Sequence, residues 1–217
     1  MAAKLILFDV ADTLLYKPAL LPALAAELAR AGIAASEAQI ARAHRATRDL
    51  LPAPDRTGRD FYLEFNARFL DVLGVLPESD LVERIYLSCR SLPWAPFPDT
   101  AVLARLGLPL GIISNWDGTL RERLGEHFPG IAFDPLLISS DAGVAKPDPR
   151  FYASALAAAR VAPGEILYVG DSVRLDMVPA TQAGMRALLI DRADHYPLYQ
   201  GERLTSLYDL ERLIDEV

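Results

Sequence analysis

Short apolar segments recur along this chain, and polar or turn residues follow each of them directly. They lie at residues 4–8, 110–113, 136–138, 166–169 and 187–190, and they lack the alternation of half-exposed strands. Such runs are typical of strands buried on both faces of a parallel sheet. Stretches of helical composition separate them, at 100–106, 120–127, 149–160 and 175–183. This alternation predicts an α/β core with a parallel sheet and helices on both faces.

Residues 18–91 interrupt the alternation. Four consecutive segments there have helical composition and period, at 18–31, 36–51, 59–73 and 78–90. Glycines and prolines separate these segments, and a proline-rich stretch at 93–98 leads back to the sheet. We therefore predict two domains: an α/β core formed by 1–16 and 92–217, and an inserted four-helix cap at 17–91.

Charge and composition exclude several classes of protein. The net charge of −7 argues against nucleic-acid binding, which normally needs a basic face. No apolar run reaches the length that spans a bilayer, and Asp9 interrupts the first run before a signal peptide could form. A single cysteine excludes an intrachain disulfide. We expect a cytoplasmic protein without nucleic-acid or membrane partners; the sequence leaves its oligomeric state open.

Polar side chains follow the predicted strands at the positions where an open α/β sheet places its active site. Four short segments, at 8–14, 113–115, 145–148 and 169–176, contribute them. The candidate side chains are Asp9, Asp12, Ser114, Asn115, Lys146, Asp171 and Asp176. Each is a weak signal alone, because such residues often cap helices or face solvent, but their shared position is informative.

Asp9 is the candidate nucleophile. A carboxylate can attack phosphorus and form an aspartyl-phosphate. Lys146 would pair with Asp9 and the transferring group, and Ser114 would donate a hydrogen bond to its oxygens. Catalysis of this kind depends chiefly on positioning and charge stabilisation.

A divalent cation would complete this site. Asp171 and Asp176 flank a predicted helix start and offer the oxygen ligands that hard cations prefer. We expect Mg²⁺ between Asp9, the main-chain carbonyl of Ala11, Asp171 and Asp176, where it would cancel charge and orient the phosphoryl oxygens.

The order and spacing of these segments resemble the haloacid dehalogenase superfamily of hydrolases. Its four motifs correspond to Asp9 with Thr13-Leu14, to Ser114-Asn115, to Lys146-Pro147, and to Gly170-Asp171 through Asp176. The resemblance implies a three-layer Rossmann-like core, a mobile α-helical cap of type I, and dependence on Mg²⁺. It also implies, most often, hydrolysis of a small phosphorylated metabolite.

The chain departs from the phosphatase pattern at one position. That pattern has a second aspartate two residues after the nucleophile, as general acid and then base, and here the residue is Ala11. An acid of this kind contributes ~10²–10⁴-fold to the rate. Asp12 occupies a position that is usually glycine in this pattern. Either its carboxylate replaces the missing acid or it only bonds local backbone, and we favour the second interpretation. We therefore expect weak or restricted phosphatase activity.

Two alternatives stay open. Haloacid dehalogenases resemble this chain in lacking the second aspartate, but they need no metal, and Asp171 with Asp176 favours a metal site. A non-catalytic binding protein of the same fold would have no need of Asp9 and Lys146 together with both carboxylates. A third possibility, a phosphonatase, is disfavoured. Phosphonatases resemble the chain in their alanine, but they use a cap lysine, and the predicted cap holds only Lys17, at its first residue.

Overall fold

The computed structural model describes residues 2–51 and 58–215. The chain forms two compact units. The core unit contains Met1–Tyr16 and Pro96–Val217, and the helical unit contains Lys17–Ala95. The two crossings between the units lie at 16/17 and 95/96, where the sequence analysis placed them at 16/17 and 91/92.

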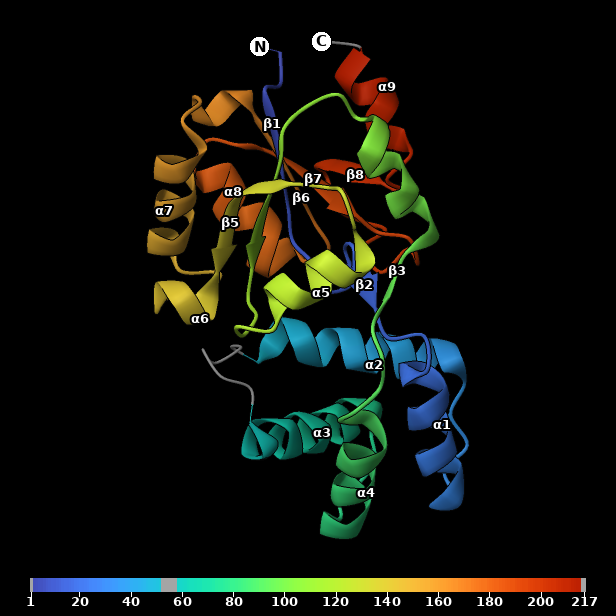
Figure 1. The fold of residues 1–217 in the computed structure, drawn as a ribbon. Coiled ribbons are helices and arrows are strands. Elements are labelled where there is room, and N and C mark those ends of the chain that lie inside the picture. Colours follow the sequence, from blue (N-terminus) through green and yellow to red (C-terminus); the bar gives the residue numbers. More distant parts are fainter. Residues whose placement is uncertain (1, 52–57, 216–217) are drawn as a thin grey trace. The chain divides into compact units, whose positions relative to one another are not determined.

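A six-stranded sheet with every strand pair parallel forms the centre of the core unit (Figure 1). The strand order is β5-β4-β1-β6-β7-β8. The strands are β1 (Leu5–Phe8), β4 (Leu110–Ser114), β5 (Phe133–Ile138), β6 (Ile166–Gly170), β7 (Arg186–Ile190) and β8 (Glu202–Leu204). The predicted α/β class is confirmed. The prediction missed β8, because only Leu204 of its three residues is buried and no apolar run marks it.

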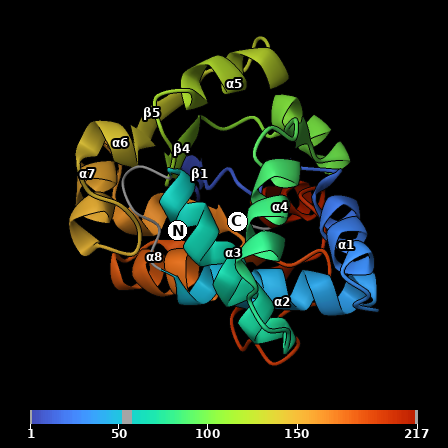
Figure 2. The same ribbon diagram turned by 90° about the horizontal axis from the view of Figure 1, so that it is seen from below.

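Helices cover both faces of this sheet. Figure 2 shows α7 (Pro149–Ala159) and α8 (Val178–Gln182) on one side of the strands. Figure 1 shows α9 (Asp209–Asp215) beside a 3₁₀ segment, Pro98–Arg105, on the other side. Leu5 and Leu7 of β1 belong to the same buried cluster as Phe151 of α7. Because side chains alternate along a strand, Ile6 lies on the opposite face, and it too is fully buried.

Two further short helices of the core unit are α5 (Leu120–His127) and α6 (Ser139–Ala142). A second, two-stranded sheet pairs β2 (Leu15–Tyr16) with β3 (Ala95–Pro96), beside the two crossings between the units. The sequence did not predict these two strands, which are too short to leave an apolar run.

The strand register brings the functional segments to one edge. Phe8 at the end of β1 pairs with Ile112 of β4 and with Val169 of β6. Residues that follow these strands, beginning with Asp9, therefore lie at the same carboxyl edge of the sheet.

The helical unit consists of α1 (Leu20–Arg30), α2 (Glu37–Leu50), α3 (Arg59–Leu73) and α4 (Ser79–Cys89). These bounds agree with the four predicted helices to within two residues. Ser36 and Gln39 form a capping box at the start of α2, and Gly74 ends α3 in a left-handed conformation. Ile40, Phe69 and Ile85 are fully buried in a common apolar cluster. Throughout the described ranges, we find no helix that could cross a membrane.

Candidate active site

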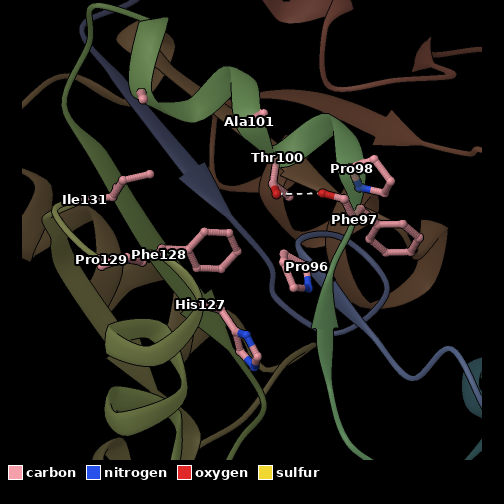
Figure 3. Close-up of a pocket in the computed structure, with 10 residues that line it drawn as sticks. Pro96, Phe97, Pro98, Thr100, Ala101, His127, Phe128, Pro129 and Ile131 are labelled. Atoms are coloured by element: carbon pink, nitrogen blue, oxygen red, sulfur yellow. Dashed lines mark hydrogen bonds between the residues drawn. The ribbon is translucent and has the colours of Figure 1, made fainter.

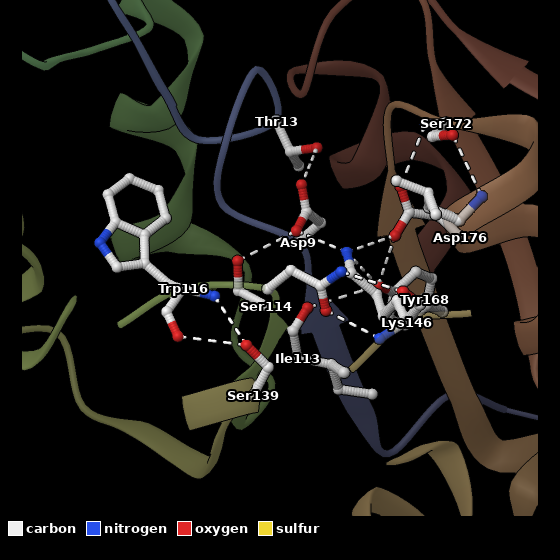
Figure 4. Close-up of polar contacts among 12 residues, drawn as sticks. Asp9, Thr13, Ile113, Ser114, Trp116, Ser139, Lys146, Tyr168, Ser172 and Asp176 are labelled. Carbon is white, nitrogen blue, oxygen red and sulfur yellow. Dashed lines mark hydrogen bonds and ion pairs between the residues drawn. The ribbon is translucent and has the colours of Figure 1, made fainter. Parts of the chain in front are cut away.

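Asp9 follows β1 directly and is almost completely buried. Its main-chain N–H donates to the carbonyl oxygen of Val169 at 2.9 Å, which continues the pairing of β1 with β6. Three side chains contact the carboxylate (Figure 4). Lys146 Nζ lies 2.6 Å from Oδ1, Ser114 Oγ donates to Oδ1 at 3.1 Å, and Thr13 Oγ1 donates to Oδ2 at 3.4 Å.

Lys146 bridges two buried carboxylates. Its Nζ lies 2.6 Å from Asp9 Oδ1 and 2.6 Å from Asp176 Oδ1, and its side chain is 3% exposed. Burial opposes the positive charge, but Asp176 and Asp9 outweigh that effect and raise the pKa of Lys146 above its ordinary value. The two carboxylates therefore favour the charged form of the ammonium group.

Asn115 is placed differently from Ser114. Its side chain accepts a hydrogen bond from the main-chain N–H of Lys146 at 2.7 Å and donates to the carbonyl oxygen of Lys146 at 3.0 Å. The contacts of Asn115 thus fix the main chain of Lys146. The two residues of the predicted pair therefore have different contacts: Ser114 contacts the candidate nucleophile, and Asn115 positions the lysine.

Asp176 lies in a π-helical turn, Val173–Met177, that follows β6. Asp176 Oδ2 accepts from the main-chain N–H of Ser172 at 3.0 Å, and Oδ1 accepts from the Tyr168 hydroxyl at 2.8 Å. Gly170 makes this approach possible, since a Cβ at this position would lie 2.5 Å from Asp176 Cγ. The glycine of the predicted fourth motif is therefore required by packing against the carboxylate.

Carboxylate oxygens of Asp9, Asp171 and Asp176 lie within 4.8 Å of one another, and all three residues are buried. Burial, together with the negative charges of Asp176 and Asp171, outweighs the lowering effect of Lys146 and raises the pKa of Asp9 to about 6. When ionised, the three carboxylates and Lys146 carry a formal charge of −2. Oxygen donors of this charge suit a hard divalent cation such as Mg²⁺, so the residues present fit the predicted metal.

The two residues after Val10 have distinct surroundings. Ala11 forms a bridge with Leu15, and the role of its carbonyl as a metal ligand stays a prediction. Asp12 is half-buried and has a φ of 61°, in the left-handed region that glycine adopts most easily. Its main-chain N–H donates to the carbonyl oxygen of Leu15 at 2.7 Å. This conformation explains why a residue tolerant of positive φ stands here; a role as acid stays a prediction.

Sequence reasoning missed Tyr168. This residue lies within β6, is fully buried, and resembles the other apolar residues of its strand in the sequence. Its hydroxyl donates to Asp176 and lies 3.4 Å from Lys146 Nζ, so it helps to hold both charged groups. The sequence did contain a signal for this role. Tyr168 stands in a strand predicted to be buried, and a buried hydroxyl needs a polar partner.

A separate hollow lies on the core unit, away from these groups (Figure 3). It has a volume of about 340 Å³, and proline, phenylalanine and other apolar side chains form most of its wall. The residues that line it are Pro96, Phe97, Pro98, Thr100, Ala101, Ala104, His127, Phe128, Pro129 and Ile131. It contains none of the candidate catalytic residues.

The family model of the haloacid dehalogenase-like hydrolases matches residues 3–184. The chain belongs to this family. This assignment accounts for the convergence of four distant segments around Asp9 and confirms the resemblance inferred from the motifs. The protein is therefore a hydrolase.

Curated relatives include proteins of this family with phosphatase names. The chain is 37% identical to a phosphoserine phosphatase of Thermus thermophilus over 128 residues, which cover 57% of this chain and 51% of that protein. It is 30% identical to haloacid dehalogenase-like hydrolase domain-containing protein 3 of Danio rerio, over 87% of this chain and 85% of that protein. It is 28% identical to a glyceraldehyde 3-phosphate phosphatase of Methanopyrus kandleri, covering 96% and 97%.

Solved structures share the fold. The putative hydrolase YfnB of Bacillus subtilis, bound to magnesium, superposes with a TM-score of 0.66 and 18% identity over 99% of this chain and 100% of its own. A 2-haloacid dehalogenase of Pseudomonas syringae gives a TM-score of 0.57 and 22% identity over 99% of each chain. At these identities, the likeness concerns the fold alone.

Proposed function

We propose that this hydrolase is a Mg²⁺-dependent phosphatase that acts on a small phosphorylated metabolite through an aspartyl-phosphate on Asp9. The observation that carries the proposal is the contact of the Asp9 carboxylate with Lys146, beside two further buried carboxylates. The names of the Thermus thermophilus and Methanopyrus kandleri relatives support a phosphorylated substrate.

In the first step, a carboxylate oxygen of Asp9 attacks phosphorus while the bond from phosphorus to the leaving oxygen breaks. Ser114 and Lys146 both contact Oδ1, and Thr13 lies on Oδ2 at 3.4 Å, so Oδ2 carries the longer and weaker contact. We assign the attack to Oδ2. Water then cleaves the aspartyl-phosphate and restores the carboxylate.

Lys146 has two tasks in this proposal. Its charge lies 2.6 Å from the nucleophile and favours the ionised carboxylate that attack requires. As negative charge moves onto the transferred oxygens, the same buried ammonium stabilises it. Asn115 and Tyr168 keep the ammonium in place without touching the substrate in this scheme.

Mg²⁺ would be held by Asp9, the Ala11 carbonyl, Asp171 and Asp176. When bound, it would neutralise phosphoryl charge and orient the oxygens. The formal charge of −2 on the ionised cluster is the physical reason to expect a divalent ion there.

The experiment is a panel of phosphometabolites and p-nitrophenyl phosphate, assayed with Mg²⁺ and with EDTA. We expect phosphate release that needs Mg²⁺, that EDTA abolishes, and that Asp9→Asn reduces to background. Ser154→Ala, which changes an exposed side chain of α7 whose hydroxyl contacts only the carbonyl oxygen of Arg150 in the same helix, is the control that keeps activity. Release that is unchanged in Asp9→Asn would contradict the proposal.

A 2-haloacid dehalogenase is the second candidate, and Ala11 favours it, because a halide leaves without needing a proton. Chloride release from 2-chloropropionate measures this activity directly. Chloride release without phosphate release would replace the phosphatase proposal. Neither activity, together with a melting temperature that Mg²⁺ leaves unchanged, would favour a non-catalytic binding protein.

A further inference from the structure

Arg192 joins three segments of the core unit that are far apart in the sequence. It follows β7 by two residues, and its side chain is 20% exposed. Nε and Nη2 of its guanidinium donate to the two carboxylate oxygens of Asp99, both at 2.8 Å. A planar guanidinium that pairs with a carboxylate through two parallel hydrogen bonds is held in one orientation.

The same guanidinium reaches the loop that follows the candidate nucleophile. Nη1 donates to the main-chain carbonyl of Asp12 at 3.3 Å, and Nη2 donates to that of Thr13 at 3.0 Å. Thr13 in turn donates its hydroxyl to Asp9. A continuous path of hydrogen bonds therefore leads from Arg192 through Thr13 to the carboxylate of Asp9.

Asp99 is itself anchored, which makes Arg192 a fixed point. Its carboxylate accepts from the main-chain N–H of Leu207 at 3.0 Å and from the Ser206 hydroxyl at 3.3 Å. Burial raises the pKa of Asp99, but hydrogen bonds from Arg192 and Leu207 outweigh this effect and hold the pKa below its ordinary value. On its other side, the guanidinium carbon lies 3.9 Å from the centre of the Phe97 ring.

The loop has a reason to need such support. Asp12 has a φ of 61°, a conformation that costs a non-glycine residue free energy and persists only when its surroundings hold it. Hydrogen bonds from Arg192 to the carbonyls of Asp12 and Thr13 act on the two residues where the loop turns.

We propose that Arg192 is a positioning residue: anchored by Asp99, it holds the loop from Val10 to Leu15 and thereby orients Asp9 for attack. Its catalytic consequence rests on the proposed function, but its effect on the loop does not. Arg192 touches no reacting atom, so its loss should lower kcat with little change in KM.

The test uses Arg192→Met, with Arg192→Lys as a milder variant, in the full-length protein. One readout is amide hydrogen exchange at Asp12, Leu14 and Leu15, whose N–H groups close the loop. The second is kcat and KM for p-nitrophenyl phosphate with Mg²⁺. We expect faster exchange in the loop, and a fall in kcat of roughly 10- to 100-fold with KM within about threefold, since small misplacements of reacting groups have effects of this size. Arg192→Lys places one ammonium group where the guanidinium contacts four acceptor oxygens. Its exchange rates and its kcat should therefore lie between those of Arg192→Met and the wild type.

Arg186→Met is the matched control. Arg186 begins β7, at the opposite end of that strand from Arg192, and its guanidinium donates two hydrogen bonds to the carboxylate of Glu202 on β8. We expect unchanged loop exchange and unchanged kcat in this variant. Unchanged exchange in both Arg192 variants, an unchanged kcat, or an equal effect of Arg186→Met would overturn the inference. If the wild type releases no phosphate, the proposed function fails, and exchange still decides whether Arg192 holds the loop.

Discussion

At the scale of single residues, the position of Lys146 carries the largest electrostatic consequence. A fully charged side chain lies out of water only because two carboxylates, each 2.6 Å away, compensate for its desolvation. Removing the lysine from this cluster would leave buried charges of one sign. The candidate catalytic lysine is therefore also a structural group.

We predict that Lys146→Met, measured in EDTA, lowers the free energy of unfolding by about 3–5 kcal/mol, because it leaves Asp9 and Asp176 buried without their cation. Urea denaturation measures this change. Lys4→Met is the control: Lys4 is 60% exposed in its pair with Glu165, and loss of such a surface pair costs about 0–1 kcal/mol. Equal effects of the two variants would contradict the electrostatic account of the cluster.

A second prediction at this scale concerns the missing acid. Ala11→Asp should increase kcat for alkyl phosphates, whose leaving oxygens need a proton, by up to ~10²–10⁴-fold. The substitution should increase kcat for p-nitrophenyl phosphate much less, because that leaving group departs without protonation. The ratio of the two rates is the measurement. Asp12→Asn, compared in parallel, should leave turnover unchanged; a large loss there would identify Asp12 as the acid.

At the scale of elements, β6 and the π-helical turn after it act as one piece. Tyr168 lies within the strand, Gly170 ends it, and Asp176 folds back over the glycine from the turn. A π-helical turn adds a residue to the ordinary helical repeat and often marks a functional site. Here it lets Asp176 meet both Ser172 and the hydroxyl of Tyr168.

This packing predicts the effect of Gly170→Ala. The added methyl group would meet Asp176 at 2.5 Å, so the carboxylate must move away from Lys146. We expect kcat to fall by roughly 100-fold, the size associated with ångström-scale misplacement. Gly125→Ala is the control, since nothing lies within 4 Å of a Cβ there and alanine favours the helix α5. Activity of Gly170→Ala equal to that of Gly125→Ala would refute the packing argument.

At the scale of the whole molecule, the chain is built as two units with separate apolar clusters. His44 belongs to the helical unit, where its ring lies 5.2 Å from that of Phe65 and 6.3 Å from that of Phe69. Burial, together with the nearby positive charges of Arg48, Arg45 and Lys17, lowers the pKa of His44 to about 3. The folded helical unit therefore keeps this histidine neutral.

Acidification should destabilise the helical unit. Between pH 6.5 and pH 3, the unfolded chain binds a proton at His44 that the folded chain does not, so the free energy of unfolding falls as the pH falls. The slope for one proton is about 1.4 kcal/mol per pH unit. Denaturant melts of wild type and His44→Gln from pH 7 to pH 5 measure it. The His44→Gln variant should lose less stability over this pH range than the wild type, and parallel curves for the two proteins would disprove the assignment.

Much of this organisation was predictable from local patterns. Apolar runs identified five of the strands in the six-stranded sheet, because burial on both faces leaves an unbroken signal. Helical composition and period, with glycines and prolines between the segments, identified the four helices of the inserted unit. Because the active site of an open α/β sheet lies at the carboxyl ends of its strands, the sequence predicted that Asp9, Lys146 and Asp176 lie together.

The tertiary structure alone decided how these groups are held. Asn115 binds the main chain of Lys146, Tyr168 binds Asp176 from inside a strand, and Arg192 reaches back to Thr13. These contacts join residues from different elements, and the local sequence does not determine which distant residue each polar side chain contacts. A periodic pattern reports which face of an element is buried, whereas the partner of a polar atom depends on where distant segments of the folded chain meet.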